Sequence, residues 1–353
     1  TLLRGDPVFD NGAEFGSPSR LQAFLNLGPI ANYPSNPSQV IPVFASSGNT
    51  TLTILGQEAG HRFLTYPRFL DPLTNRSSLA LLGRDNAHWS FFFNSDASVE
   101  EGNRIEDRGP GQTPRFRTTA TVQHYSAFDQ YLMGLRLASE VAPSFLVRNP
   151  SAGFSGDPPR SGVEFDGTRQ DITVQMIIDA EGRRIPDATV AQKHFNYAFV
   201  LLTREGTEPS AEDLSQLERM RSEWERFFAG AVDNRGSART SLAKQLRLST
   251  WPAGGVLRGS TATATVSIGA ALSNTLQVLL TADSGLLTVP AAVTIPAGGT
   301  TASFPVTGTR AGISELAARV ADPAYDVSRT LVQVRDDASP LRWDIVSGNN
   351  QRG

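Results

Sequence analysis

The sequence has 353 residues, of which 39% are hydrophobic and 19% charged, and a formal net charge of −3. This composition is typical of a globular protein and excludes a collagen-like or wholly disordered chain, and the balance of 32 basic against 35 acidic residues argues against a nucleic-acid-binding protein. No apolar run approaches the roughly 18 residues of a membrane span, and the absence of cysteine excludes disulfides and thiolate chemistry.

The first element with a chemical signature is a helix predicted over residues 52–64. In a helix, Gln57 and His61 are four residues apart and share one face, with Glu58 beside them. This is the spacing of the H-E-x-x-H zinc helix, in which two histidines bind the metal and the glutamate activates the bound water. Here Gln57 replaces the first histidine, and an amide oxygen is a weaker zinc ligand than an imidazole nitrogen.

Two glycines bear on the interpretation of this helix. The alternative to a metal site is an amphipathic core helix that happens to contain one histidine. Gly56 and Gly60 each cost a helix interior about 1 kcal/mol relative to alanine. Propensity alone does not select two such residues, so the glycines indicate close packing or a ligand.

Further candidate ligands follow in chain order. His88 lies 27 residues after His61, a separation that a helix-loop-strand connection can bridge, and Trp89 would shield the site. We therefore expect zinc to be held by Gln57, His61 and His88, against the alternative that His88 is a structural turn residue. His124 is a weaker candidate, since it precedes a helix.

Carboxylates in the same block have mainly structural interpretations. Ser126 and Asp129 fit a capping box at the start of a helix that includes residues 131–135. Asn94, Asp96 and Glu100 offer oxygen ligands for calcium, although their spacing does not match an EF-hand loop. Calcium is accordingly the weaker metal prediction.

The order of these motifs resembles that of secreted bacterial zinc metallopeptidases of the zincin class. The resemblance rests on Gln-Glu-Ala-Gly-His over residues 57–61, on Trp89-Ser90, and on the segment 124–135 with its Leu-Met-Gly-Leu ending. It covers about residues 10–240 and implies an α+β zincin-like domain over residues 1–250, zinc as cofactor, Glu58 as general base and a peptide or protein substrate. Two departures are Gln57 and the Val99-Glu100 pair, which stands where a Met turn would be expected.

The clearest helix is predicted over residues 211–231. Ser210 is a natural N-cap, and Asp213 sits where a capping-box acid belongs. Apolar residues recur at helical spacing on one face, which indicates a core helix: Leu214, Leu217, Met220, Trp224, Phe227 and Phe228. The apolar run 197–203, just before this helix, predicts a buried strand.

The composition changes near Trp251, after which the chain is rich in Thr, Val, Ala and Ser. Alternating segments separated by turn signals predict an all-β sandwich over residues 255–336, with strands at 261–268, 275–281, 286–289, 292–295, 301–306, 314–320 and 329–334. The phrases at 288–290, 293–299 and 302–304 resemble bacterial immunoglobulin-like repeats of secreted and surface proteins. This resemblance implies a secreted or cell-surface protein, and residues 337–353 read as a tail or linker.

Two functional hypotheses remain open. The first is a secreted peptidase that hydrolyses peptide bonds with a zinc-activated water. The alternative keeps the fold without the activity: a catalytically inactive scaffold that binds a partner, or a subunit of an extracellular assembly that self-associates through its β-sandwich. The metal content of the protein separates the enzyme from the scaffold.

Overall fold

The computed structural model describes residues 23–63, 66–241, 244–251, 255–282 and 285–336. Their contacts divide into a first unit that ends at Thr240 and a second unit that begins at Ser241. Within these residues, no helix has both the length and the apolar character needed to cross a membrane. The predicted tail over residues 337–353 lies outside the described residues.

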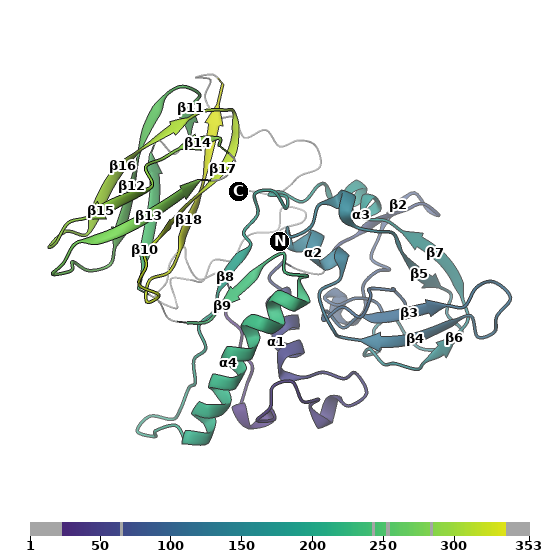
Figure 1. The fold of residues 1–353 in the computed structure, drawn as a ribbon. Helices are drawn as coiled ribbons and strands as arrows, with labels where there is room; N and C mark the ends of the chain where they lie inside the picture. The colour runs from purple at the N-terminus through teal and green to yellow at the C-terminus, as the bar shows by residue number, and fades with distance from the viewer. Residues whose placement is uncertain (1–22, 64–65, 242–243, 252–254, 283–284, 337–353) are drawn as a thin grey trace. The chain divides into compact units, whose positions relative to one another are not determined.

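The second unit is a β-sandwich of two sheets (Figure 1). Its strands are β10 (Leu246–Trp251), β11 (Val256–Leu257), β12 (Thr261–Ile268), β13 (Leu276–Ala282), β14 (Leu287–Thr288), β15 (Ala292–Ile295), β16 (Thr301–Gly308), β17 (Gly312–Arg319) and β18 (Ser328–Arg335). One sheet has the order β10-β12-β16-β14 and the other the order β11-β18-β17-β13-β15. The predicted sandwich is confirmed.

The sandwich core follows from the alternation of residues along each strand. In β12, Ala264, Val266 and Ile268 are buried while the residues between them are more exposed, as the two-residue period of a strand requires. The structure adds β10, which lies before the predicted start at residue 255 and pairs antiparallel with β12. The sandwich therefore begins earlier than the change in composition indicated.

The first unit combines four α-helices with small sheets, in the residues that the structure describes. The helices are α1 (Thr51–Gly60), α2 (Ala127–Met133), α3 (Val174–Glu181) and α4 (Ala211–Ala231). The strands are β1 (Phe69–Asp71), β2 (Arg76–Ser78), β3 (Asn103–Asp107), β4 (Phe116–Thr121), β5 (Ser144–Arg148), β6 (Glu164–Phe165), β7 (Thr168–Ile172), β8 (His194–Asn196) and β9 (Ser237–Arg239). They form the sheets β1-β2, β3-β4-β6, β5-β7 and β8-β9. Across the ranges given above, the regular structure is predominantly β.

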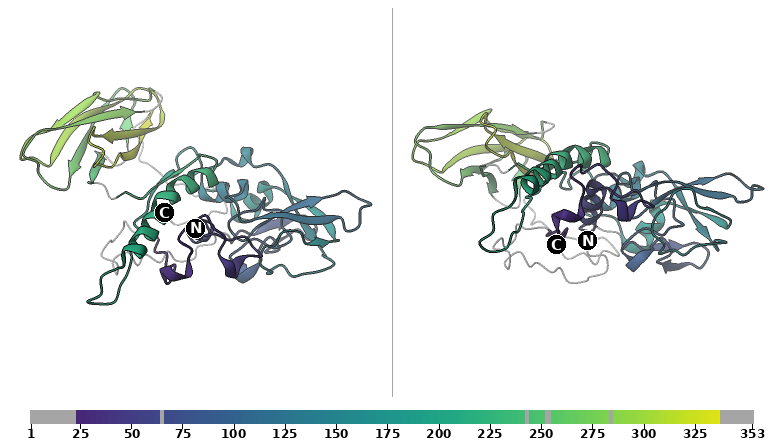
Figure 2. Two further views of the ribbon diagram at one scale, coloured as in Figure 1. Left: turned by 60° about the horizontal axis from the view of Figure 1, so that its bottom comes forward. Right: turned by 90° about the horizontal axis from the view of Figure 1, so that it is seen from below.

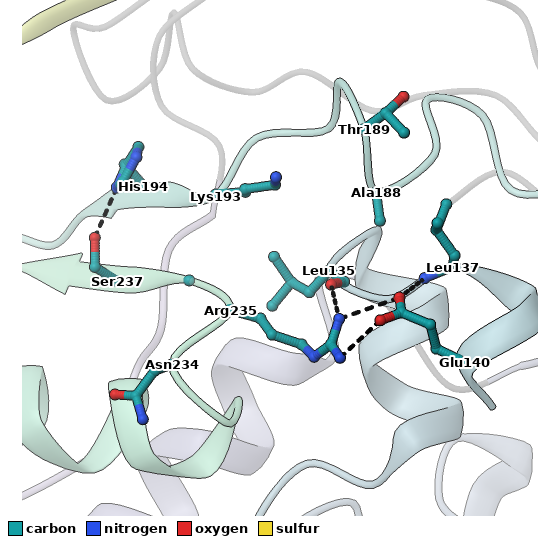
Figure 3. Close-up of a pocket in the computed structure, with 11 residues that line it drawn as sticks. Leu135, Leu137, Glu140, Ala188, Thr189, Lys193, His194, Asn234, Arg235 and Ser237 are labelled. Carbon is teal, nitrogen blue, oxygen red and sulfur yellow. Dashed lines mark hydrogen bonds and ion pairs between the residues drawn. The ribbon is translucent and has the colours of Figure 1, made fainter. Parts of the chain in front are cut away.

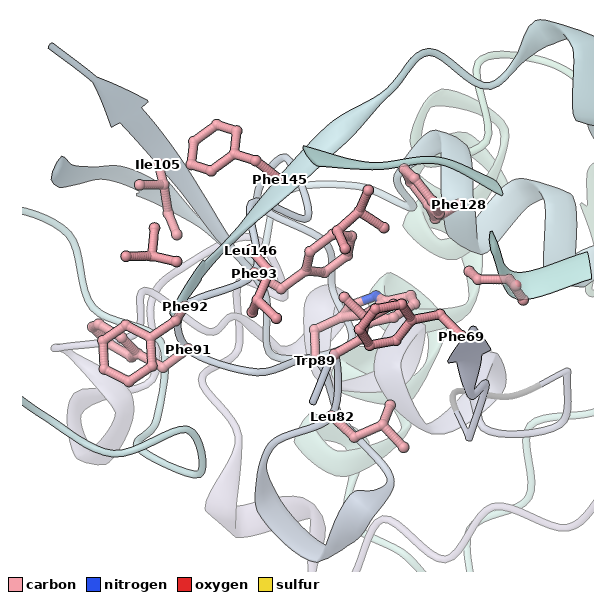
Figure 4. Packing of buried hydrophobic residues seen from close by; sticks show 14 of the residues in the cluster. Phe69, Leu82, Trp89, Phe91, Phe92, Phe93, Ile105, Phe128, Phe145 and Leu146 are labelled. Carbon is pink, nitrogen blue, oxygen red and sulfur yellow. The ribbon is translucent and has the colours of Figure 1, made fainter. Parts of the chain in front are cut away.

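An aromatic core lies among these small sheets. The rings of Trp89 and Phe93 have centroids 5.0 Å apart, and Phe93 meets Phe128 of α2 edge to face at 5.5 Å (Figure 4). Edge-to-face contacts of this kind add to the stabilisation that burial provides. Trp89 also donates a hydrogen bond from Nε1 to Asp129 Oδ1 at 2.8 Å. This core fixes the segment that carries His88.

Helix α4 runs beside α1, as Figures 1 and 2 both show. Its predicted bounds are confirmed, and Ser210 Oγ accepts from the Asp213 backbone N–H at 3.0 Å. Its buried face contains Met220, Trp224 and Phe228, whereas Leu214 is 48% exposed, contrary to prediction. The contact with α1 passes through Gly56, where a Cβ atom would lie 3.2 Å from Phe227 Cε1.

The strand predicted over residues 197–203 is wrong. The regular strand is β8, which ends at Asn196, and Val200 and Leu202 are 71% and 81% exposed. Tyr197 and Phe199 still pack against the core, and Tyr197 contacts Trp224 edge to face. An apolar run is a strand only where a neighbouring strand is available, and β9 pairs with 194–196 alone.

Candidate functional site

The first residues of the candidate site lie on α1. A capping box stabilises the N-terminus of this helix. Thr53 N donates to Thr50 Oγ1, and Thr50 N donates to Thr53 Oγ1. The helix ends at Gly60, with His61 as its C-cap, so it is shorter than the predicted 52–64, and residue 64 lies outside the described residues. Gln57 and His61 share one face, as predicted, with Gln57 Nε2 3.2 Å from His61 Nε2.

His88 reaches the same point from a loop. Its Nε2 lies 2.8 Å from Gln57 Nε2, and its ring lies edge to face with that of His61 at 4.9 Å. The loop contains Asp85 and Asn86 with φ of 57° and 53°. Asp and Asn tolerate this left-handed conformation better than most residues. The structure therefore brings together all three predicted metal-site residues, which we call the Gln57 cluster: Gln57, His61 and His88.

The hydrogen bonds of the cluster determine which imidazole nitrogens act as acceptors. His88 Nδ1 lies 2.9 Å from the Arg84 carbonyl oxygen, and a carbonyl can only accept, so Nδ1 carries the proton. In the neutral ring His88 Nε2 is then an acceptor. The Gln57 amide nitrogen has two hydrogens and donates one to each imidazole Nε2.

Glu100 lies behind His61. Its Oε2 is 3.4 Å from His61 Nδ1, and its side chain is only 2% exposed. Glycine at position 60 makes this approach feasible, because a Cβ there would lie 1.7 Å from Glu100 Oε1 and 3.0 Å from Tyr125 Cε1. The two glycines of the predicted helix are thus explained by close packing, Gly56 against α4 and Gly60 against Glu100.

Arg84 contributes a positive charge to the cluster. Its Nη2 lies 3.1 Å from His88 Nε2. The guanidinium is held by a forked interaction with Glu101, including Nε to Oε2 at 3.0 Å, and by Asp85. Arg84 therefore donates toward the same His88 lone pair as the Gln57 amide.

The electrostatic environment keeps His61 uncharged at neutral pH. Burial lowers the pKa of His61 to about 4, with the His88 ring acting in the same direction and the Glu101 carboxylate opposing it. An uncharged imidazole at this position agrees with its role as acceptor for the Gln57 amide. The cluster consequently holds an uncharged His61 that accepts from the Gln57 amide and lies near the Arg84 guanidinium.

A zinc peptidase centre needs three protein ligands and an open position for water. The part of the chain that the structure describes contains no group of three or more His, Cys, Asp or Glu side chains that could hold a metal ion. The resemblance to zincin-type metallopeptidases is therefore wrong, and the zincin-like part of the α+β fold expected for residues 1–250 is not confirmed. A three-member set exists only if the Gln57 amide is included.

The remaining predicted residues lie in different surroundings. Glu58 is half-buried on α1 and makes no hydrogen bond or ion pair with the described residues. His124 lies away from the cluster's polar contacts: its Nε2 is 2.8 Å from the Asp96 carbonyl oxygen. The Ser126–Asp129 capping box is confirmed, and the helix that follows it, α2, begins at Ala127.

The predicted calcium ligands are engaged by different partners. Asn94 Oδ1 accepts from the Ile105 backbone N–H at 2.9 Å, and Asp96 pairs with Arg104 at 2.6 Å. Glu100 faces His61. The side-chain oxygens of these three residues therefore have separate partners and do not form one calcium site.

Sequence reasoning did not single out Arg84 and gave Glu100 a different role. Arg84 precedes a loop with two consecutive positive φ angles, and the polar run Arg84-Asp85-Asn86 was the available signal. Glu100 is predicted as a calcium ligand, whereas its backbone carbonyl accepts from the Trp89 N–H at 3.0 Å and its side chain is buried beside His61.

No family model and no curated protein matches the sequence. Among solved structures, the chain is similar to a CARDB domain from Pyrococcus furiosus, with 16% identity over 28% of this chain and all of that one, at a TM-score of 0.21. It is also similar to domains 4 and 5 of the S-layer protein SbsC, at 17% identity, and to the D0–D1 domain of intimin, at 20%, each over 28% of this chain and with a TM-score of 0.21. The chain spans 56% and 52% of these two fragments. Likenesses with such TM-scores carry no argument about function.

Proposed function

We propose that this chain is a non-catalytic extracellular protein that works by binding or by structural assembly. In this proposal the Gln57 cluster fixes helix α1 to the loop that carries His88. The β-sandwich is a separate module of the kind that can engage a partner or a second copy of the chain. Hydrolysis of peptide bonds is not part of its function.

The observation that carries the proposal is the hydrogen bonding of the Gln57 amide. Its Nε2 lies 3.2 Å from His61 Nε2 and 2.8 Å from His88 Nε2, so it uses the lone pairs that a metal ion would need. A metal ion would require the amide to rotate and present its oxygen. It would also require the Arg84 guanidinium, 3.1 Å from His88 Nε2, to withdraw, because a metal cation and a guanidinium repel each other at this distance.

A second candidate is weak binding of a zinc ion by the Gln57 cluster without hydrolysis. One observation favours it: both imidazoles have their Nδ1 atoms directed at acceptors, the Arg84 carbonyl oxygen at 2.9 Å and Glu100 Oε2 at 3.4 Å. Metal-binding histidines are commonly oriented in this way by an acceptor behind the ring. The same experiment decides between the two candidates.

The test measures zinc content and zinc affinity of the full chain by mass spectrometry and calorimetry, together with hydrolysis of a fluorescent casein. We expect no stoichiometric zinc, no hydrolysis, and no change on Glu58→Gln. Zinc at about one per chain without hydrolysis would establish the second candidate, and zinc with Glu58-dependent hydrolysis would overturn both.

Gln57→His is the informative variant, and Gln112→His, in an exposed loop, is its matched control. If the amide is what keeps zinc out, Gln57→His gains zinc affinity and Gln112→His does not. Light scattering of the wild-type chain at rising concentration measures self-association.

A further inference from the structure

A second site of a different kind lies in the first unit. It is a cleft of about 510 Å³, within the 300–1,000 Å³ typical of small-molecule pockets. Its walls come from the segment after α2, the loop before β8, and the turn between α4 and β9 (Figure 3). The apolar lining offers mainly Leu137, which is half-buried, because Leu135 and Ala188 are only 2% and 9% exposed. Polar groups come from Thr189, Lys193 and Asn234 among others.

The two opposite charges at one wall of the cleft neutralise each other. Arg235 donates from Nη1 and Nη2 to the two carboxylate oxygens of Glu140 at 3.1 and 2.9 Å. Glu140 Oε2 also accepts from the Leu137 backbone N–H at 2.8 Å. These hydrogen bonds lower the pKa of Glu140, so the carboxylate stays ionised and keeps the guanidinium occupied.

Besides Arg235, which is paired with Glu140, the cleft is lined by the positively charged Lys193. None of the described carboxylates forms an ion pair with it, and Figure 3 shows its side chain extending from the β8 side into the cleft. Its backbone is fixed, because its carbonyl oxygen accepts from Ser237 N at 2.8 Å. Lysine is rare in this chain: it occurs only at positions 193 and 244, and the other basic residues are arginines.

We propose that this cleft binds a small molecule with one carboxylate and a short apolar body. Lys193 pairs with the carboxylate, and Leu137 contacts the apolar part. A phosphate dianion is a poorer match, since it favours several cationic donors and Arg235 is already held by Glu140. The carboxylate belongs to a free organic acid or to the C-terminus of a peptide. The inference does not depend on the Gln57 cluster, which contributes no residue to this cleft.

The scarcity of lysine makes the test specific. Reductive methylation of the full chain with ¹³C-formaldehyde labels Lys193 and Lys244, together with the terminal amine, and preserves the positive charge of both lysines. Lys193→Met and Lys244→Met assign the two lysine resonances. The probes are 4-methylpentanoate, N-acetyl-alanyl-leucine, N-acetyl-alanyl-leucinamide, which lacks the carboxylate, and inorganic phosphate.

We expect both carboxylate probes to shift the Lys193 resonance saturably, while Lys244 stays unchanged and the amide has no effect. Lys193→Met should weaken binding at least tenfold by calorimetry, and Lys244→Met should leave it unchanged. Tighter binding of the peptide than of the free acid identifies a peptide C-terminus as the ligand, and the reverse order identifies an organic acid. No saturable shift, equal shifts with acid and amide, or preference for phosphate would overturn the proposal.

Discussion

The two units of this chain differ in how often residues other than glycine adopt a positive φ angle. In the described residues of the sandwich, positive φ angles occur only at glycines, whereas the first unit holds ten other residues in this conformation. These are Asn75, Asp85, Asn86, Asp96, Ala97, Glu101, Val122, Asn149, Asp233 and Asn234. Each costs energy relative to ordinary backbone conformations. Asn and Asp tolerate this conformation better than most residues, so tertiary contacts are needed chiefly to hold Ala97, Glu101 and Val122.

The buried polar residues show the same contrast. Among the described residues, Ser314 is the only buried polar side chain of the sandwich, whereas the first unit buries His88, Glu100, Asp129 and Gln130 together with many hydroxyl and amide groups. Buried polar groups are stable only when their partners are in place. The stability of the sandwich should thus depend mainly on its buried apolar volume. The stability of the first unit should depend also on its buried hydrogen-bond partners and on pH.

The largest expected effects come from emptying each core. Phe228→Ala in the first unit should cost about 3–5 kcal/mol, and Leu316→Ala in the sandwich about 2–5 kcal/mol, since both side chains are fully buried. Urea unfolding is followed by NMR of the four histidines, all of which lie in the first unit, and by far-ultraviolet dichroism. We expect the histidine transition to move only with Phe228→Ala. Equal movement with both variants would show that the two units unfold as one.

Gly60→Ala tests the close approach of Glu100 to α1. The new Cβ would lie 1.7 Å from Glu100 Oε1, so we expect a loss of about 1–3 kcal/mol in the free energy of unfolding, as for other overpacked sites. Gly56→Ala is the matched control: its Cβ would lie 3.2 Å from Phe227 Cε1, and the gain in helix propensity of about 1 kcal/mol offsets the contact. Equal effects of the two changes on thermal unfolding would contradict this account.

The pH dependence of stability should distinguish the units. Because the pKa of His61 falls from 6.5 to about 4 on folding, the unfolded chain binds more protons between these values. Stability of the first unit therefore rises as pH increases from about 4 to 6.5, by roughly 1–2 kcal/mol after allowance for partial solvation of the ring.

Histidine NMR titration checks this directly. The His61 resonance should titrate near pH 4. His124 should titrate above its usual range, because the hydrogen bond to Asp96 raises its pKa, so its contribution to stability is present at low pH and is lost as pH rises. The region after residue 240 has no histidine, so the sandwich should lack both effects. A His61 resonance that titrates near 6.5 would disprove the burial argument.

The smallest effects are expected at a helix cap and at a surface ion pair. Ser126→Ala removes the acceptor of the Asp129 backbone N–H and should cost about 1 kcal/mol in chemical denaturation. Arg329→Ala in the sandwich breaks the 3.1 Å pair with Glu315, both side chains being partly exposed, and should cost at most about 0.5 kcal/mol. A larger loss for Arg329→Ala than for Ser126→Ala would reverse the expected order.

The sandwich was largely predictable from sequence because its strands alternate locally. Residues 261–268 and 292–295 were predicted to the residue, since burial in a strand repeats every two positions. Strand β10 was missed because it precedes the change in composition that marked the boundary. Strand β11 has only two residues, too few to show a period.

The candidate site was predictable only where the contacting residues lie on the same helix. The contact between Gln57 and His61 follows from helical spacing, and α4 was identified by its cap and apolar face. The positions of Arg84 and Glu100 depend on backbone contacts between separate loops, such as Trp89 N to Glu100 O. No local pattern encodes such contacts. The error over residues 197–203 has the same origin, because an apolar run does not reveal whether a neighbouring strand exists.

The parallel pairing of β8 with β9 changes what a cut in the backbone would do. These strands bracket residues 197–236, and Phe195 and Ala238 are buried between them and α4. A protease that cleaves near the exposed Leu202 therefore leaves two pieces still joined by the strand pairing and by the aromatic contacts of Trp224 and Phe228. The first unit is thus a natural candidate for division into two complementing fragments, with the break placed in this loop.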